Sequence, residues 1–169
     1  MELNAFTTVF RSHEGNRPAD NVQVYSNPET LAHFSRMAQV YGAWLPYRRQ
    51  LVQEAAATGL PVVRHPFIHY PDDPQVLDLS YQQFMVGSEF MVAPVLDPGL
   101  AQVEVYLPAG RWVHVWSGQV YGDPGQGQQV QVAAPLGQPA VFFREGSAAG
   151  QQFVEALDAA GLRAQPVVE

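Results

Sequence analysis

The sequence contains no cysteine and no lysine, and each absence narrows the possible functions. Without cysteine there is no disulfide framework and no thiolate zinc site, while the redox compartment stays undetermined. All nine basic residues are arginine and stand against 16 acidic residues, which gives a net charge of −7. A nucleic-acid-binding protein needs a basic stripe, and none is visible, so we expect no nucleic-acid partner.

Long apolar runs are also missing. The uninterrupted apolar runs fall far short of the ~20 residues that span a bilayer, so we expect no membrane partner. Residues 1–11 have neither the basic region nor the apolar stretch of a secretory signal, which favours a cytoplasmic location. Phosphate-binding loops, dinucleotide fingerprints and nucleophile elbows are absent too. Hydrophobic residues still make up 47% of the chain, which is enough for a packed core.

The N-terminal residues predict a buried strand that leads into a long loop. Residues 5–10 are apolar, β-branched or aromatic, and the residues after them are polar. His13 follows this predicted strand closely, with Arg11 beside it. In an α/β barrel that position faces the mouth of the active site. On pattern alone, an ordinary surface-loop histidine is the simpler interpretation.

Residues 28–58 predict two helices or one kinked helix. Apolar residues recur three and four positions apart, as a helix with one buried face requires. Asn27 suits the N-cap position, and Pro46 is expected to kink or divide the segment because it removes a backbone hydrogen bond. Gly59 supplies the C-terminal stop.

From residue 60 onwards the sequence predicts short antiparallel strands. Residues 97–139 hold seven glycines and five prolines, a density that favours turns and strands over helices. Ser147 can cap one last helix. The strands are expected at residues 60–63, 67–70, 84–87, 90–96, 103–107, 112–116, 130–132 and 140–144.

One histidine pair and one acidic pair could be mistaken for a metal site or a catalytic site. His65 and His69 have the spacing of a helical zinc pair, but Pro66 indicates an extended chain, so we expect no metal. Asp72 and Asp73 could be a paired acid and base. Because they lie between two prolines, a solvated turn is the better interpretation.

Trp112, Trp116 and Tyr121 could form an aromatic platform for a sugar. Both tryptophans fall on the same side of a strand whose side chains alternate between its two faces. The sequence therefore favours sandwich core at these positions over an exposed binding surface.

Several blocks of the sequence resemble glycoside hydrolase family 31, in the same order. Residues 5–13 are similar to the eighth barrel strand of that family, which has an aromatic-x-x-aromatic-x-Arg-x-His pattern. The blocks at 44–47, 59–66, 83–95 and 106–112 are similar to later family segments, although His65 is inserted before the family's proline. The loop at 13–18 and the residues at 32–34 most resemble the sulfoquinovosidase branch and its bacterial α-glucosidase neighbours.

This resemblance implies an α/β unit followed by an all-β unit. Residues 1–59 would be the last strand–helix unit of a (β/α)8 TIM barrel, the C-terminal piece of a catalytic domain. Residues 60–146 would form a small antiparallel β-sandwich, and residues 147–169 a C-terminal helix and tail. We also expect the chain to begin at an internal methionine of a larger enzyme.

The resemblance also implies a function. The family consists of retaining α-glycosidases, whose two catalytic aspartates face each other across the sugar. Both lie upstream of this chain, so we expect part of a hydrolase of α-glucosides or α-sulfoquinovosides that is inactive by itself. A non-catalytic carbohydrate-binding or structural module is the alternative.

Two residues carry the site that the resemblance implies. His13 is expected to hydrogen-bond a hydroxyl of the bound sugar, and Arg11 to orient the end of the strand. No cofactor is implied. The expected partners are the α-glycoside and the missing upstream part of the barrel, or a second copy bound through an exposed edge at Phe6, Val9 and Phe10.

Overall fold

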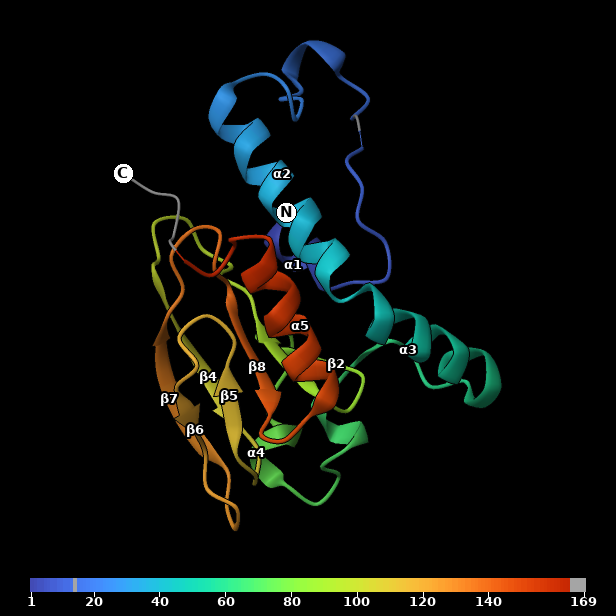
Figure 1. The fold of residues 1–169 in the computed structure, drawn as a ribbon, viewed down its shortest axis with the longest axis vertical. Helices are drawn as coiled ribbons and strands as arrows, with labels where there is room; N and C mark the ends of the chain where they lie inside the picture. The colour runs from blue at the N-terminus through green and yellow to red at the C-terminus, as the bar shows by residue number, and fades with distance from the viewer. Residues whose placement is uncertain (14, 165–169) are drawn as a thin grey trace.

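A computed structural model describes residues 1–13 and 15–164 of the chain. Helices and loops come first, and a sandwich of strands with a final helix follows (Figure 1). The helical elements are α1 (Glu2–Ala5), η1 (Pro18–Asp20), α2 (Pro28–Ala43), α3 (Leu45–Thr58), η2 (Pro66–Ile68), α4 (Pro74–Leu77) and α5 (Ala148–Ala159). The strands are β1 (Val63–Arg64), β2 (Phe84–Val86), β3 (Phe90–Ala93), β4 (Gln102–Leu107), β5 (Trp112–His114), β6 (Val120–Tyr121), β7 (Gln128–Ala133) and β8 (Ala140–Arg144).

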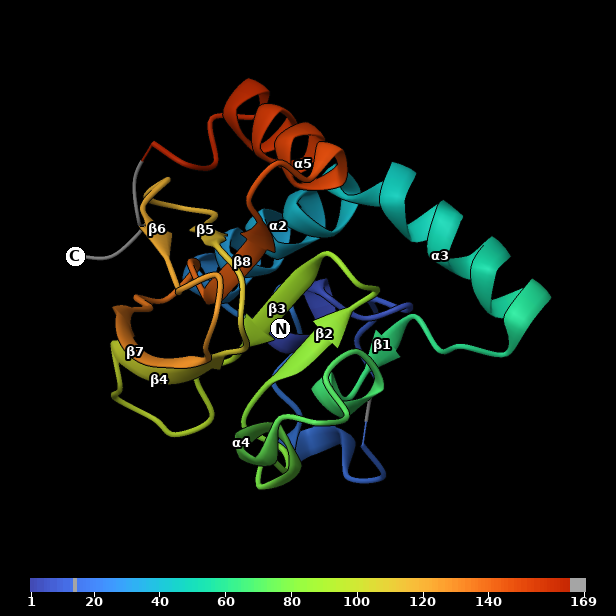
Figure 2. The same cartoon turned by 90° about the horizontal axis from the view of Figure 1, so that it is seen from below.

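The strands form two antiparallel sheets. Six of them form one sheet in the order β1-β2-β3-β8-β5-β6, and β4 pairs with β7 in the other. Figure 2 shows the six-stranded sheet lying between α5 and the β4–β7 pair. This arrangement confirms the predicted antiparallel β domain with a C-terminal helix.

Alternate residues of the six-stranded sheet enter two different cores. Met91 and Phe142 are register partners on β3 and β8 and pack toward β4 and β7. Their neighbours Phe90 and Phe143, also partners, pack toward the helices, where Phe153 of α5 meets Phe90 at a ring-centroid distance of 5.6 Å. Both faces of this sheet are therefore buried, which explains why β3 has no polar residue.

The helix boundaries follow the signals in the sequence. The Asn27 side chain accepts a hydrogen bond from the Thr30 amide at 2.7 Å and caps α2. Pro46 lies in the first turn of α3, and Gly59 ends that helix with φ +81°. Ser147 caps α5 by accepting from the Gly150 amide. The expectation of two helices and the three caps is confirmed.

The predicted strand at residues 5–10 is wrong for this chain. Glu2–Ala5 is a short helix, and residues 6–10 are in neither helix nor strand. A strand needs a neighbour to receive its backbone hydrogen bonds, and none of the eight strands of the described residues pairs with this segment. The sheet that would make it a barrel strand is not part of the structure.

Two smaller expectations also fail. Of the strands expected at 60–63 and 67–70, only the two-residue β1 forms, and Pro66–Ile68 is a 3-10 turn capped by His65. Trp112 and Trp116 are both buried, as expected, but they lie in different cores. The reason is that β5 ends at His114, and Trp116 lies within the turn that the Gly118 amide closes on the His114 carbonyl.

Candidate functional site

The segment that carries His13 is fastened along α2. The indole of Trp44 donates to the Ala5 carbonyl at 2.7 Å, and the Tyr41 hydroxyl donates to the Thr8 carbonyl at 2.7 Å. The Phe10 ring stacks on Tyr41 at a centroid distance of 5.5 Å. Figure 1 shows this segment running beside α2 toward the η1 turn. The backbone entering Arg11 is thus held by α2 rather than by a sheet.

Arg11 and His13 themselves are exposed. Among residues 1–13 and 15–164, no hydrogen bond or ion pair joins either side chain to another group. Both side chains can therefore reach a ligand. The structure brings them to one loop, but it does not enclose them.

The loop after His13 is closed by its own polar contacts. The Gly15 amide donates to the Asn21 side chain at 3.2 Å, and the Asn21 amide group donates back to the Gly15 carbonyl at 3.3 Å. Asn27 then starts α2. Glu14, which belongs to the loop that resembles the family, lies outside the described residues.

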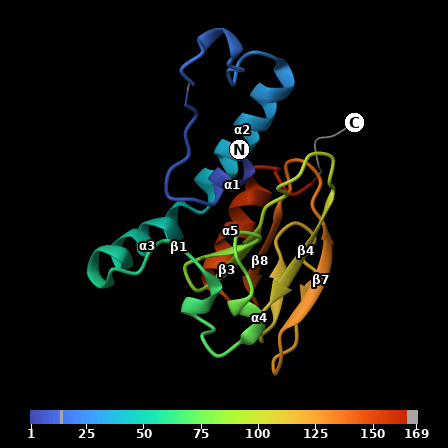
Figure 3. The same cartoon turned by 180° about the vertical axis from the view of Figure 1, so that it is seen from behind.

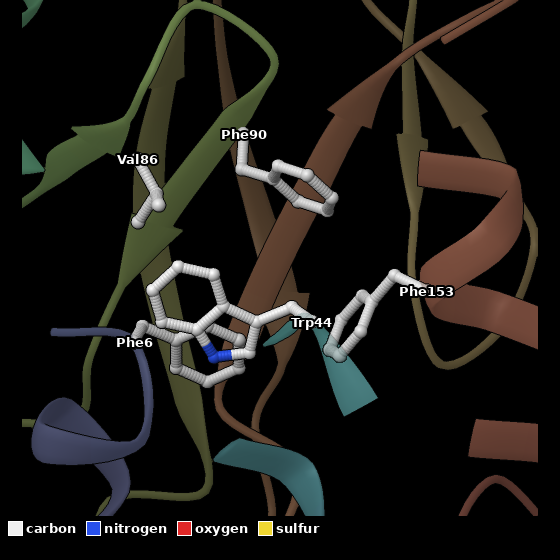
Figure 4. Close-up of a pocket in the computed structure, with 5 residues that line it drawn as sticks. All are labelled: Phe6, Trp44, Val86, Phe90 and Phe153. Atoms are coloured by element: carbon white, nitrogen blue, oxygen red, sulfur yellow. The ribbon is translucent and has the colours of Figure 1, made fainter. Parts of the chain in front are cut away.

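A pocket lies close to this segment, but it is a gap in the core. Side chains from α1's end, the α2–α3 junction, the sheet and α5 turn toward one another around it (Figure 4). The gap does not admit water, and its lining is entirely apolar. It holds no polar group to orient a ligand, so we assign it to packing. Its lining is Phe6, Trp44, Val86, Phe90 and Phe153.

The surface of the described residues has hollows as well, and two of them border the segments discussed above or the sandwich loops. The larger, about 570 Å³, lies between residues 95–101 and 134–136, with Glu2 at its edge. The smaller, about 280 Å³, lies between Thr8 and the first half of α3. Neither is lined by Arg11 or His13.

The histidine pair considered for zinc makes other contacts. The Nδ1 atom of His65 accepts from the Phe67 amide, and its Nε2 lies 3.1 Å from the Leu79 carbonyl. His69 Nε2 lies 3.3 Å from a guanidinium nitrogen of Arg64. Within the described part of the chain, no group of three or more histidine and acidic residues is placed to hold a metal ion.

The acidic pair also has a structural role. Asp73 caps α4 by accepting from the Gln75 amide at 3.0 Å, and it accepts the Tyr106 hydroxyl at 2.8 Å. Burial, together with the hydrogen bond to Asp73 and the charge of that carboxylate, raises the pKa of Tyr106 to about 12. Asp72 is exposed in the turn that the sequence predicts.

The structure contains buried ionisable groups that the sequence did not reveal. Arg64 is 2% exposed and pairs with Glu54 at 2.6 Å, ten positions earlier on α3. His114 is buried with its Nε2 atom unpartnered, and burial lowers its pKa to about 4. No spacing rule links Arg64 to Glu54, because a chain reversal at Gly59 brings them together.

Most of the chain is similar in sequence to known proteins of one family. Residues 59–148 match the model of the glycosyl hydrolase family 31 C-terminal domain. The chain is 46% identical over 147 residues to a sulfoquinovosidase of Agrobacterium fabrum, covering 86% of this chain and 22% of the relative. It is 33% identical over 150 residues to alpha-glucosidase 2 of Bacillus thermoamyloliquefaciens, covering 88% and 18%. The chain thus spans about a fifth of the length of the curated relatives it matches.

Solved structures agree with this match. A family 31 sulfoquinovosidase from E. rectale, in complex with an aza-sugar inhibitor, superimposes with a TM-score of 0.86 at 36% identity. That match covers 94% of this chain and 23% of the other. A family 31 alpha-xylosidase from Xanthomonas citri gives a TM-score of 0.76 at 30% identity, covering 86% and 16%. No helix of the described residues has the length and apolar character needed to cross a membrane.

Proposed function

The chain belongs to glycoside hydrolase family 31, and from that premise we propose that it is the C-terminal part of a retaining α-glycosidase. The match of residues 59–148 to the family's C-terminal domain carries this proposal. The substrate class is an α-glucoside or an α-sulfoquinovoside, because relatives of both kinds align with most of the chain. The nucleophile and the acid/base aspartate belong to the portion that the alignments leave outside this chain.

We assign His13 to the sugar-binding site of the complete enzyme. An imidazole nitrogen that accepts a hydrogen bond from a sugar hydroxyl holds it more strongly in the transition state, because the positive charge that develops on the ring makes the hydroxyl a better donor. The exposure of His13 and its lack of a partner within the described residues support this role. Arg11 is equally unpaired, so it can reach a carboxylate of the remaining enzyme and orient the segment.

In the complete enzyme, residues 1–59 would belong to the barrel, residues 60–146 to the sandwich, and residues 147–169 to the terminal helix and tail, of which 165–169 lie outside the described residues. Apolar side chains exposed on the N-terminal half, Val9 at 61% and Leu31 at 50%, are surface that the rest of the barrel can cover. Phe6 is buried and Phe10 is partly buried by α2, so the apolar edge for self-association is smaller than expected.

A cytoplasmic location stays a prediction, which subcellular fractionation can test.

A free-standing sugar-binding module is less favoured by the structure. Trp112 is fully buried and Trp116 is 7% exposed, so the two rings cannot form an open stacking platform. Their indole nitrogens donate to the carbonyls of Pro108 and Pro139, respectively. Titration with glucose or maltose checks this point, and we expect no saturable binding.

A hybrid enzyme tests the proposal. The chain would replace the aligned C-terminal segment of the Agrobacterium sulfoquinovosidase, and hydrolysis of nitrophenyl α-sulfoquinovoside and α-glucoside would be measured. We expect turnover with retention of configuration. His13→Ala should lower kcat/KM by about 10²–10³-fold, the cost of removing one hydrogen bond that strengthens in the transition state. A folded hybrid without activity, or one indifferent to His13→Ala, would contradict the proposal.

A further inference from the structure

A groove with two arginines in its lining lies where α3 starts to leave the body of the molecule. Its volume is about 280 Å³, and it is lined by Thr8 on one side and by Arg48, Arg49, Val52 and Gln53 of α3 on the other. Figures 1 and 3 show α3 projecting from the rest of the fold. The groove is thus walled by two segments that are far apart in the sequence.

Arg48 is held in place at this groove by aromatic side chains. Its guanidinium carbon lies 3.6 Å from the centroid of the Tyr41 ring and 4.6 Å from that of Trp44. One of its terminal nitrogens donates to the Tyr41 carbonyl at 2.8 Å. The side chain is only 8% exposed, so the guanidinium is preorganised rather than free in solvent.

The positive charge at the groove has no anionic partner. Within residues 1–13 and 15–164, no carboxylate lies within ion-pair distance of Arg48 or Arg49. The acidic residue of α3, Glu54, pairs with Arg64 instead. Burial lowers the pKa of Arg48; the nearby Tyr41 raises it, and the nearby Arg49 lowers it.

Arg48 has a backbone carbonyl and two aromatic rings as partners but no anion within the described residues, and an oxyanion shared with the exposed Arg49 would add charge-assisted hydrogen bonds. We propose that this groove is a binding site for a small oxyanion, held by the guanidinium groups of Arg48 and Arg49. Arginine matches carboxylate, sulfate and phosphate oxygens with two parallel hydrogen bonds. Thr8 and Gln53 supply neutral polar groups on the same lining.

The start of α3 supports the same ligand charge. The helix begins at Leu45 without a side-chain cap and with no acidic residue in its first turn. The first turn of α3 therefore supplies no carboxylate that would compete with an anion for Arg48, and the positive end of the helix dipole favours such an anion. The groove carries two arginines on a chain whose net charge is −7, so the local charge is opposite in sign to that of the whole chain.

The test uses the full 169-residue chain and its melting temperature in sodium chloride, sodium sulfate or sodium acetate at matched ionic strength. Sulfate stabilises many proteins without binding a site, so variants are needed to separate the two effects. Arg49→Gln removes a groove charge, and Arg17→Gln removes an exposed charge from the distant loop. Both positions are exposed, so both variants should fold.

We expect sulfate to raise the melting temperature of the wild-type chain and of Arg17→Gln by about 3 °C more than that of Arg49→Gln. The side-chain NH signal of Arg48 should shift with a saturating dependence on sulfate. A larger response to acetate than to sulfate would assign the groove to carboxylates, including those of protein side chains, and the reverse would assign it to free tetrahedral anions. Equal responses of all three proteins, or a shift that grows linearly without saturation, would overturn the proposal.

Discussion

The packing of α5 on the six-stranded sheet can be tested with a single methyl group. Gly150 lies in the first turn of α5, directly over Phe143 of β8. A Cβ atom added there would meet the Phe143 ring at 2.0 Å and the Phe143 Cβ at 2.8 Å. Rotating the ring cannot relieve the second contact, because Cβ is fixed to the backbone. The helix or the strand must therefore move.

We expect Gly150→Ala to lower the free energy of unfolding by about 2 kcal/mol, the usual range for overpacking a core. For a chain of this size, that corresponds to a melting temperature lower by about 4–8 °C. Gly42→Ala is the matched control, because Gly42 is also in a helix but has nothing within 4 Å of its added Cβ. There the methyl should stabilise by about 0.5–1 kcal/mol. Thermal unfolding followed by circular dichroism measures both. A Gly150→Ala variant as stable as the wild type would refute the packing argument.

Three further outcomes are expected. The free energy of unfolding should fall by up to about 3 kcal/mol between pH 6.5 and 4, because burial lowers the pKa of His114 to about 4 and the unfolded chain takes up a proton first. Urea titrations should show a flatter dependence of the free energy of unfolding on pH for His114→Gln. An unchanged pH dependence in that variant would exclude His114 as the cause. Trp44→Phe should lower the free energy of unfolding by about 1–3 kcal/mol and speed amide hydrogen exchange in residues 1–10, since the Ala5 carbonyl loses its indole donor. Unchanged exchange in those residues would count against the proposal that Trp44 holds this segment in place. His13→Ala should leave the melting temperature of the isolated chain within about 1–2 °C of the wild type, because the side chain is exposed and has no hydrogen-bond or ion-pair partner among the described residues. A larger drop would reveal a structural role.

The parts of the fold that the sequence predicted correctly are governed by local chemistry. Asn27 and Ser147 cap their helices, and Gly59 adopts the left-handed conformation that ends α3. These features depend on a few neighbouring residues, so their signals are complete within a short window. The central strands β3 and β8 were equally legible, because strands buried on both faces are almost wholly apolar, and Arg144 at the end of β8 is the one exception in these two strands.

The errors arise where distant residues decide the outcome. Residues 5–10 have the composition of a strand, yet without a neighbouring strand their backbone turns along α2 instead. The two tryptophans separate because β5 ends at His114, which periodicity alone does not indicate. Tertiary packing likewise decides that Arg64 pairs with Glu54 and that Arg48 stacks on Tyr41 and Trp44. For the candidate site, the sequence identified His13 and Arg11 as neighbours on a loop, and the family resemblance rather than any local pattern supplied their proposed role.

The most direct test of the central claim is the initial rate of nitrophenyl α-glycoside hydrolysis by the isolated chain, measured beside the hybrid enzyme under the same conditions. If the catalytic aspartates belong to the missing portion, the isolated chain gives no turnover above background while the hybrid does. Saturable hydrolysis by the isolated chain that disappears in His13→Ala would contradict the account, because it would show a complete active site within these 169 residues.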